Sequence, residues 1–174
     1  MRILVTGSEG FLGKVLCRQL RNNSHEVIGY DIANGSDILD NFQFRTAMAD
    51  CDVCIHLAAI ADLYIAEHQP ELARNLNINA TKSLLEIAEE LGIRVLFAST
   101  VCASGNKGVA VCVEESPLAP TEVYAESKAE AEQLFYDKLD KHAILRLATF
   151  YGPNMRKSLA TSIFIEALKN DEQI

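Results

Sequence analysis

Short, almost continuously apolar runs alternate along this chain with longer segments in which apolar residues recur every three or four positions. The clearest short runs are Ile3-Leu4-Val5, Val53 to Leu57 and Ala143 to Leu147. Runs without polar alternation are typical of strands that are buried on both faces, whereas the longer segments have the period of helices. The chain is therefore predicted to be an α/β protein with a doubly wound parallel sheet and helices on both faces.

The predicted elements follow one another in a regular strand and helix order. We expect strands at residues 3–5, 27–30, 37–39, 53–57, 95–98 and 143–147. We expect helices at residues 11–20, 41–48, 71–91, 122–140 and 158–169, the third of which is stopped by Gly92. A chain of 174 residues is large enough to bury a substantial core, so residues 1–174 are predicted to form a single domain.

The overall charge and hydropathy argue against several classes of partner. The formal net charge is −8, which is unfavourable for binding nucleic acid or anionic membranes. No apolar run approaches the roughly 20 residues that a membrane span requires. The first residues enter a strand pattern directly, without the apolar region of a signal peptide, so we expect a cytoplasmic protein.

The five cysteines indicate free thiols in a reducing compartment. Cys51 and Cys54 have the spacing of a redox or metal-binding pair, but that function needs a helix N-terminus or a second pair of ligands. Cys54 instead enters a predicted buried strand, and the four His residues have no ligand spacing. We therefore expect both cysteines to be packing residues and expect no metal site.

Three glycines lie between the first predicted strand and the first predicted helix. Gly7, Gly10 and Gly13 have the spacing Gly-x-x-Gly-x-x-Gly, at the place where a dinucleotide-binding fold brings its backbone against a pyrophosphate. A helix N-terminus at this point attracts the phosphates. Asp31 ends the second strand, where a carboxylate accepts both ribose hydroxyls and repels a 2′-phosphate. The combination predicts a Rossmann-like domain that prefers NAD to NADP; the alternative is a simple turn with a strand-capping aspartate.

Tyr124 and Lys128 are four residues apart in a predicted helix, so their side chains share one face. An ammonium group beside a phenol stabilises the phenolate and lowers the pKa of the phenol from about 10 toward neutral. Tyr124 is therefore a candidate general acid or base. The spacing alone arises by chance in about one chain in four of this composition, so its weight depends on the other motifs.

In the order and spacing of its motifs the chain resembles the extended short-chain dehydrogenase/reductase family, the NAD-dependent epimerase/dehydratase group. The resemblance covers essentially all 174 residues. The matching motifs, in chain order, are the glycine loop, Asp37-Ile38, His56-Leu57-Ala58-Ala59, Asn77-Ile78-Asn79-Ala80-Thr81, Ser99-Thr100, Glu115 to Pro120, Tyr124 with Lys128, and Arg146 with Tyr151-Gly152-Pro153.

The resemblance implies a role for each matching position. The implied catalytic set is Thr100, Tyr124 and Lys128. The residues implied to bind NAD are Gly7, Gly10, Phe11, Leu12, Gly13, Asp31, Asp37, Ile38, Leu57, Ala58, Ala59, Tyr124 and Lys128. For His56 and Asn77 the alternative to a ligand contact is a structural role, as a satisfied core histidine and as support for nearby backbone.

The implied reaction moves a hydride between NAD and a hydroxyl or keto carbon. Tyr124 would move the proton, Thr100 would orient the same substrate oxygen, and Lys128 would hold the nicotinamide ribose. This implies an NAD-dependent epimerase or oxidoreductase whose substrate is a nucleotide sugar. Val101-Cys102 replaces the Asp-Glu pair of family dehydratases, which disfavours sugar 4,6-dehydration. A non-catalytic dinucleotide-binding or sensor module is the alternative function.

Members of this family are considerably longer, and their additional C-terminal part builds most of the substrate pocket. We therefore expect the C-terminal substrate domain to be largely absent, and residues 1–174 to be the NAD-binding part of a longer enzyme. A natural short form that binds NAD with little catalysis is the alternative. Family members often dimerise through two helices per subunit, which implies a homodimer through residues 71–91 and 122–140, although packing on the sheet explains the same apolar residues.

Overall fold

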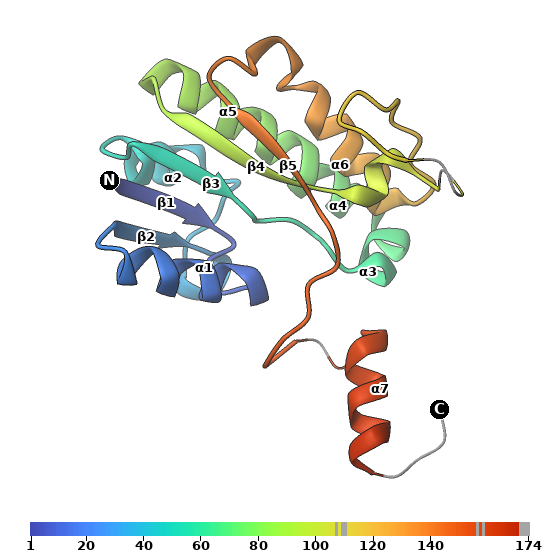
Figure 1. Cartoon of the computed structure of the whole chain (residues 1–174). Helices are drawn as coiled ribbons and strands as arrows, with labels where there is room; N and C mark the ends of the chain where they lie inside the picture. Colours follow the sequence, from blue (N-terminus) through green and yellow to red (C-terminus); the bar gives the residue numbers. More distant parts are fainter. Residues whose placement is uncertain (107, 109–110, 156, 158, 171–174) are drawn as a thin grey trace.

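A single parallel sheet organises the molecule (Figure 1). The computed structural model describes residues 1–106, 108, 111–155, 157 and 159–170. The strands are β1 (Arg2–Thr6), β2 (Glu26–Tyr30), β3 (Val53–His56), β4 (Arg94–Thr100) and β5 (Ala143–Leu147). Their order in the sheet is β2-β1-β3-β4-β5, and every neighbouring pair is parallel. The chain thus winds in one direction from β1 to β2 and in the other from β3 to β5, and sheets of this kind bind ligands at the carboxyl ends of the two strands where the direction changes, here β1 and β3.

Helices follow each of the first four strands. They are α1 (Phe11–Asn22), α2 (Asn41–Met48), α3 (Leu63–His68), α4 (Pro70–Arg74), α5 (Ala80–Leu91), α6 (Val123–Gln133) and, after β5, α7 (Ala160–Lys169). Shorter helical turns are η1 (Ile32–Asn34), the π-helical η2 (Asn75–Asn79), η3 (Val101–Ser104) and η4 (Tyr136–Lys138). In the described part of the chain, no helix is long and apolar enough to span a membrane.

The two faces of the sheet carry separate hydrophobic clusters. On one face, Ile3, Val5, Val53 and Ile55 pack with Cys17 of α1. On the other face, side chains of β1, β3 and β4 pack against α2, α5 and α6 in a larger cluster. The predicted doubly wound sheet with helices on both faces is therefore confirmed, and the central strands β1 and β3 are buried because helices cover both of their sides.

The cover on the α1 side does not extend over the whole sheet. Leu145 pairs in register with Ala98, and this row of side chains faces the same side as α1. Leu145 is nevertheless 47% exposed. The last helix, α7, lies apart from the sheet, and Ile163, Phe164 and Leu168 on it are exposed (Figure 1).

The predicted strand at residues 37–39 is wrong. This segment is a turn in which the Asp37 N–H donates to Gln43 Oε1 and the Leu39 N–H donates to Asp37 Oδ1. Side chains therefore satisfy backbone groups that a strand would pair with the sheet. Ile38 is nevertheless buried in the core, which explains why the segment is apolar.

The predicted helices need three corrections. The helix expected at 71–91 is three consecutive pieces, α4, η2 and α5, which end at Gly92 in the left-handed conformation that favours glycine. The helix expected at 122–140 ends at Gln133 and is followed by η4. The helix expected from residue 158 begins at Ala160, and residue 158 itself is outside the described part; α3 was not predicted.

The cysteines are free thiols, as predicted. Cys51 and Cys54 are both buried, and burial raises the pKa of each thiol. Raised thiol pKa values are typical of unreactive packing residues. Among the described residues, no group of three or more His, Cys, Asp or Glu side chains is placed to hold a metal ion.

Candidate active site

Two of the three loop glycines are required by close packing. Gly7 has a φ of +68°, and a Cβ on it would lie 2.8 Å from the Ala58 backbone nitrogen. A Cβ on Gly13 would lie 2.1 Å from the Gly7 carbonyl oxygen. Both contacts are with backbone that cannot rotate away. These two glycines therefore bring the turn after β1, the start of α1 and the segment after β3 into direct contact.

Gly10 is different, because little of the protein lies against it. Among the described residues, a Cβ on Gly10 would meet only the Gly7 carbonyl oxygen, at 3.2 Å. Gly10 is the N-cap of α1 and makes no side-chain cap. The N–H groups of the first helical turn, which includes Phe11 and Leu12, have no partners within the helix. The loop thus offers an uncapped helix N-terminus, which is a favourable site for a phosphate.

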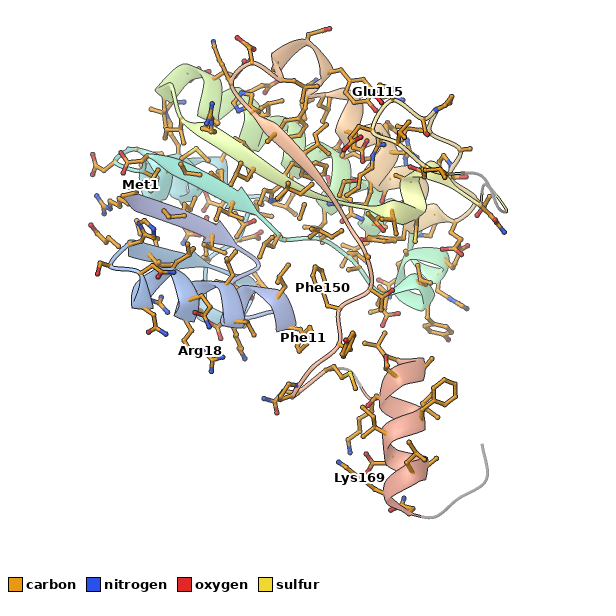
Figure 2. All side chains as sticks on the ribbon, in the orientation of Figure 1. Met1, Phe11, Arg18, Glu115, Phe150 and Lys169 are labelled. Atoms are coloured by element: carbon orange, nitrogen blue, oxygen red, sulfur yellow. The ribbon has the colours of Figure 1, made fainter. Side chains whose placement is uncertain are left out.

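The chain that follows β5 returns to this helix N-terminus. It crosses the carboxyl edge of the sheet, and Figure 2 shows Phe150 of this segment in the same region as Phe11 of α1. A Cβ on Gly152 would lie 3.6 Å from Phe11 Cζ, so the two segments are in contact. This segment therefore lies next to the N-terminus of α1.

Asp31 lies directly after β2 and is fixed by the glycine loop. The Glu9 N–H donates to Asp31 Oδ2 at 3.0 Å, and the Ala33 N–H donates to Asp31 Oδ1 at 2.9 Å. These two bonds orient the carboxylate beside the loop, where it can accept ribose hydroxyls. Asp37 and Ile38 follow on the same side of the sheet, but Ile38 packs into the core with Tyr30 and Phe44.

His56 is a satisfied core histidine that organises the end of β3. The Thr81 hydroxyl donates to the Asn77 carbonyl oxygen at 2.8 Å, so it accepts from His56 Nε2–H at 2.9 Å. His56 Nδ1 is then the acceptor for the Thr6 hydroxyl at 2.7 Å. Burial, and next the charge of Lys128, lower the pKa of His56 to about 3. The imidazole is therefore neutral and serves as a bridge, not as an acid or base.

Thr6 connects His56 to the backbone that follows β3. Its Oγ1 accepts the N–H groups of Leu57 and Ala58, both at 3.1 Å. Ala58 is also the residue against which Gly7 packs. The predicted cofactor segment Leu57-Ala58-Ala59 is thus held in place by a buried chain of polar side chains, consistent with a positioning role for the histidine.

Asn77 connects the same region to the helix that carries Tyr124. Its side chain accepts from the Ile60 N–H at 2.8 Å and donates to the Ile60 carbonyl oxygen at 3.1 Å. It also donates to Ser127 Oγ at 2.9 Å, and the Ser127 hydroxyl donates to the Tyr124 carbonyl oxygen at 2.7 Å. Asn77 therefore supports the backbone at Ile60 and, through Ser127, at Tyr124. This is the structural role that was the alternative to a ligand contact for this residue.

Thr100 is the last residue of β4 and lies at the same edge of the sheet. Its Oγ1 accepts the Cys102 N–H at 3.2 Å, which leaves its own proton available to a substrate oxygen. The loop that follows is tight at Gly105, where φ is +67° and a Cβ would lie 2.0 Å from the Ala119 carbonyl oxygen. The segment at Ala119 therefore lies against Gly105, directly after η3, and η3 itself packs against α6. The fold thereby brings Thr100 near the helix of Tyr124.

Tyr124 and Lys128 both lie on α6, one turn apart, as predicted. Lys128 is only 2% exposed, and its Nζ lies 4.0 Å from the centre of the Phe97 ring. Burial lowers the pKa of Lys128 to about 7, and the nearby Glu132 carboxylate opposes this shift. The side chain can therefore change its protonation near neutral pH, which is a property of proton-transfer sites.

Glu132 is fully buried one further turn along α6. Arg146 of β5 donates to it through Nε to both carboxylate oxygens at 3.1 Å, and through Nη2 at 2.8 Å. The Tyr136 hydroxyl is 3.3 Å from Glu132 Oε2. The ion pair raises the already high pKa of Arg146 further. Glu132 and Ser127 were not among the predicted site residues, although both recur at helical spacing from Tyr124 and Lys128.

The chain is similar in sequence to known proteins over nearly its whole length. The model of the family described as "NAD dependent epimerase/dehydratase family" matches residues 3–174. An uncharacterized UDP-glucose epimerase of Bacillus subtilis, YtcB, is 31% identical over 92% of this chain and 60% of the relative. The methionine adenosyltransferase 2 subunit beta of Xenopus laevis is 27% identical over 94% of this chain and 52% of the relative.

A solved structure extends this similarity to the fold. The UDP-glucuronic acid 4-epimerase of Bacillus cereus, in complex with UDP-glucuronic acid and NAD, is 28% identical, with a TM-score of 0.86 over 99% of this chain and 64% of that chain. The chain thus spans between about half and two thirds of the length of these relatives. From the family model and the shared fold, the chain belongs to the NAD-dependent epimerase/dehydratase family, a group of the extended short-chain dehydrogenases/reductases.

Proposed function

We propose that this chain binds NAD across the carboxyl ends of β1, β2 and β3. The uncapped N-terminus of α1 at Gly10, Phe11 and Leu12 would hold the pyrophosphate, and Asp31 would accept the adenosine ribose hydroxyls. The bound NAD of the Bacillus cereus epimerase supports this assignment. The remaining proposed contacts are Gly7, Gly13, Asp37, Ile38, Leu57, Ala58, Ala59, Tyr124 and Lys128.

The proposed chemistry is proton transfer at a hydroxyl or keto carbon, for which NAD supplies the hydride acceptor. Tyr124 takes the proton from the substrate hydroxyl, and the charge of Lys128 favours the phenolate that this requires. Thr100 donates its free proton to the same substrate oxygen. The observation that carries the proposal is the buried Lys128 side chain one turn from Tyr124 on α6.

The proposed substrate is a nucleotide sugar, on which the protein would act as an epimerase or oxidoreductase. The Bacillus subtilis relative is named as a UDP-glucose epimerase, and the Bacillus cereus epimerase holds UDP-glucuronic acid. Residues 1–174 would then be the NAD-binding domain of the active protein, and most of the sugar pocket would lie outside it.

A non-catalytic dinucleotide-binding module is the second candidate. It is favoured by the relative that is named as the beta subunit of methionine adenosyltransferase 2. The two candidates make different predictions for the protein encoded by the complete gene. A module binds NAD without turning over any nucleotide sugar, whereas an epimerase or oxidoreductase interconverts or oxidises at least one of them.

A titration followed by a turnover assay separates these functions. NAD affinity is measured first by isothermal titration calorimetry, and the NADH absorbance and sugar products are then followed with a panel of UDP- and dTDP-sugars. Net NADH indicates a dehydrogenase, whereas an isomerised sugar without NADH indicates an epimerase. NAD binding without any product would replace the leading proposal with the module.

We also propose a homodimer through the predicted helices at residues 71–91 and 122–140, which correspond to α4, η2 and α5 and to α6 with η4. Arg74 and Glu130 form an ion pair at 2.8 Å that joins the two helices on an exposed surface. A monomeric mass in sedimentation would contradict this. The free thiols further support a cytoplasmic location.

A further inference from the structure

Three ionisable side chains repeat at intervals of four residues along α6. Tyr124, Lys128 and Glu132 therefore lie on one face of the helix, one turn apart. Lys128 is 2% exposed and Glu132 is 0% exposed, so this face is buried against the sheet. Two buried groups of opposite charge on neighbouring turns interact more strongly than they would in water.

Among the described residues around Lys128, few groups other than Glu132 stabilise a positive charge. From β3 it faces His56, which is neutral, and from β4 it faces the Phe97 ring, which attracts the cation weakly. From β5, Arg146 is the other cation of this buried region. Tyr124 on its own helix is uncharged until it gives up its proton. The Glu132 carboxylate is the main group that opposes the effect of burial on Lys128.

Glu132 is itself held firmly. Arg146 contacts both of its carboxylate oxygens, at 2.8 to 3.1 Å, and the Tyr136 hydroxyl is a second partner. A buried ion pair is often no more stabilising than an apolar pair of similar size. Stability alone therefore does not account for a fully buried carboxylate one turn from a buried ammonium group.

We propose that Glu132, fixed by Arg146, is a positioning residue that keeps Lys128 protonated in its buried site and so keeps Tyr124 in the reactive phenolate form. Its action on Lys128 is independent of any substrate. Only the consequence for Tyr124 rests on the proposed function.

The direct test is the protonation of Lys128, measured by NMR titration of protein labelled with ¹³C at the lysine ε carbons. The Lys128 signal is assigned from its loss in Lys128→Arg. Glu132→Gln removes the charge and keeps the shape, and we expect the Lys128 midpoint to fall by about one pH unit, a tenfold change in the protonation equilibrium. Glu130→Gln is the matched control, because Glu130 lies on α6 but is exposed and pairs with Arg74. It should leave the midpoint unchanged.

Glu132→Gln leaves the partly buried Arg146 without a carboxylate partner, and the variant is at risk of not folding. The double variant Glu132→Met/Arg146→Met removes both charges and retains the volume. It should fold and still lower the Lys128 midpoint, because Glu132 is the charge that opposes the effect of burial on Lys128. A wild-type midpoint in whichever of these variants is folded would overturn the proposal.

The catalytic consequence has a separate readout. In Glu132→Gln the acidic limb of the pH profile of kcat/KM should move to higher pH, because a less charged Lys128 favours the phenolate less. Rescue of turnover at high pH distinguishes this effect from a merely structural defect. A lowered Lys128 midpoint with an unchanged pH profile would support the action of Glu132 on Lys128 and contradict the proposed role of Tyr124 and Lys128.

Discussion

Two alanine substitutions in one loop should have opposite effects on folding and on cofactor binding. In Gly13→Ala the new methyl group would lie 2.1 Å from the Gly7 carbonyl oxygen and 2.8 Å from Ser8 Cα. Neither atom can move without separating α1 from the turn after β1. Overpacking of a rigid site costs about 1–3 kcal/mol and sometimes more. We therefore expect Gly13→Ala to lose at least about 2 kcal/mol of unfolding free energy.

Gly10→Ala should leave the fold intact. Gly10 has φ −70°, which alanine adopts easily, and its methyl group would meet one carbonyl oxygen at 3.2 Å. The reduced freedom of the unfolded chain contributes about 0.4–1 kcal/mol in favour of alanine, which offsets this contact. The methyl group would, however, stand at the helix N-terminus where we place the pyrophosphate. We expect at least a tenfold weaker NAD affinity, about 1.4 kcal/mol.

Urea unfolding and calorimetric titration with NAD measure the two effects separately. Gly92→Ala is the control, because Gly92 has φ +71°, lies at the end of α5, and would place its Cβ more than 4 Å from the other described residues. It should cost about 1–2 kcal/mol of stability without changing NAD affinity. The reasoning would be refuted if Gly10→Ala destabilised the fold as much as Gly13→Ala, or if it bound NAD with wild-type affinity.

The buried polar bridge leads to two further predictions. Thr81→Val leaves His56 Nε2–H without its acceptor and should lower the free energy of unfolding in urea by about 1–3 kcal/mol. Thr81→Ser keeps the hydroxyl and should lower it clearly less. Equal losses of unfolding free energy in the two variants would contradict the bridge. The pKa of His56 is lowered from 6.5 to about 3 in the folded protein, so below pH 6.5 the unfolded chain binds the extra proton. The unfolding free energy should fall as the pH decreases through this window, by at most about 1.4 kcal/mol per pH unit, and a His56→Asn variant that shows the same slope would contradict the assignment.

The arrangement of the sheet could be predicted from the sequence because its determinants are local. Residues 143–147 and 41–48 have the bounds of β5 and α2 in the structure, since each has a clear period and clear end signals. The glycine spacing predicted the tight turn after β1, because backbone contacts require glycine at Gly7 and Gly13. Such contacts allow no residue other than glycine, so the spacing of the glycines in the sequence indicates where the backbone segments meet.

The errors occurred where a distant side chain decides the local conformation. At residues 37–39, Gln43 takes the backbone N–H that a strand would give to the sheet. Asn77 lies in the π-helical turn η2, and its side-chain amide bonds to Ile60 and Ser127. The spacing of apolar residues in the sequence gives no indication of such hydrogen-bond partners. From the sequence, Glu132 would be taken for a solvent-exposed helix residue. Its buried position depends on Arg146, which lies fourteen residues later on β5.

The central claim is that Tyr124 transfers the proton in an NAD-dependent reaction. Its most direct test is the rate of hydride transfer to NAD by Tyr124→Phe, compared with wild type, in the protein encoded by the complete gene and with a nucleotide sugar that it turns over. We expect unchanged NAD affinity in calorimetry and a rate that falls by about 10²–10⁴-fold, because only the phenolic oxygen is removed. A Tyr124→Phe rate within about threefold of wild type would contradict the claim, because that is far less than the loss of a general base produces.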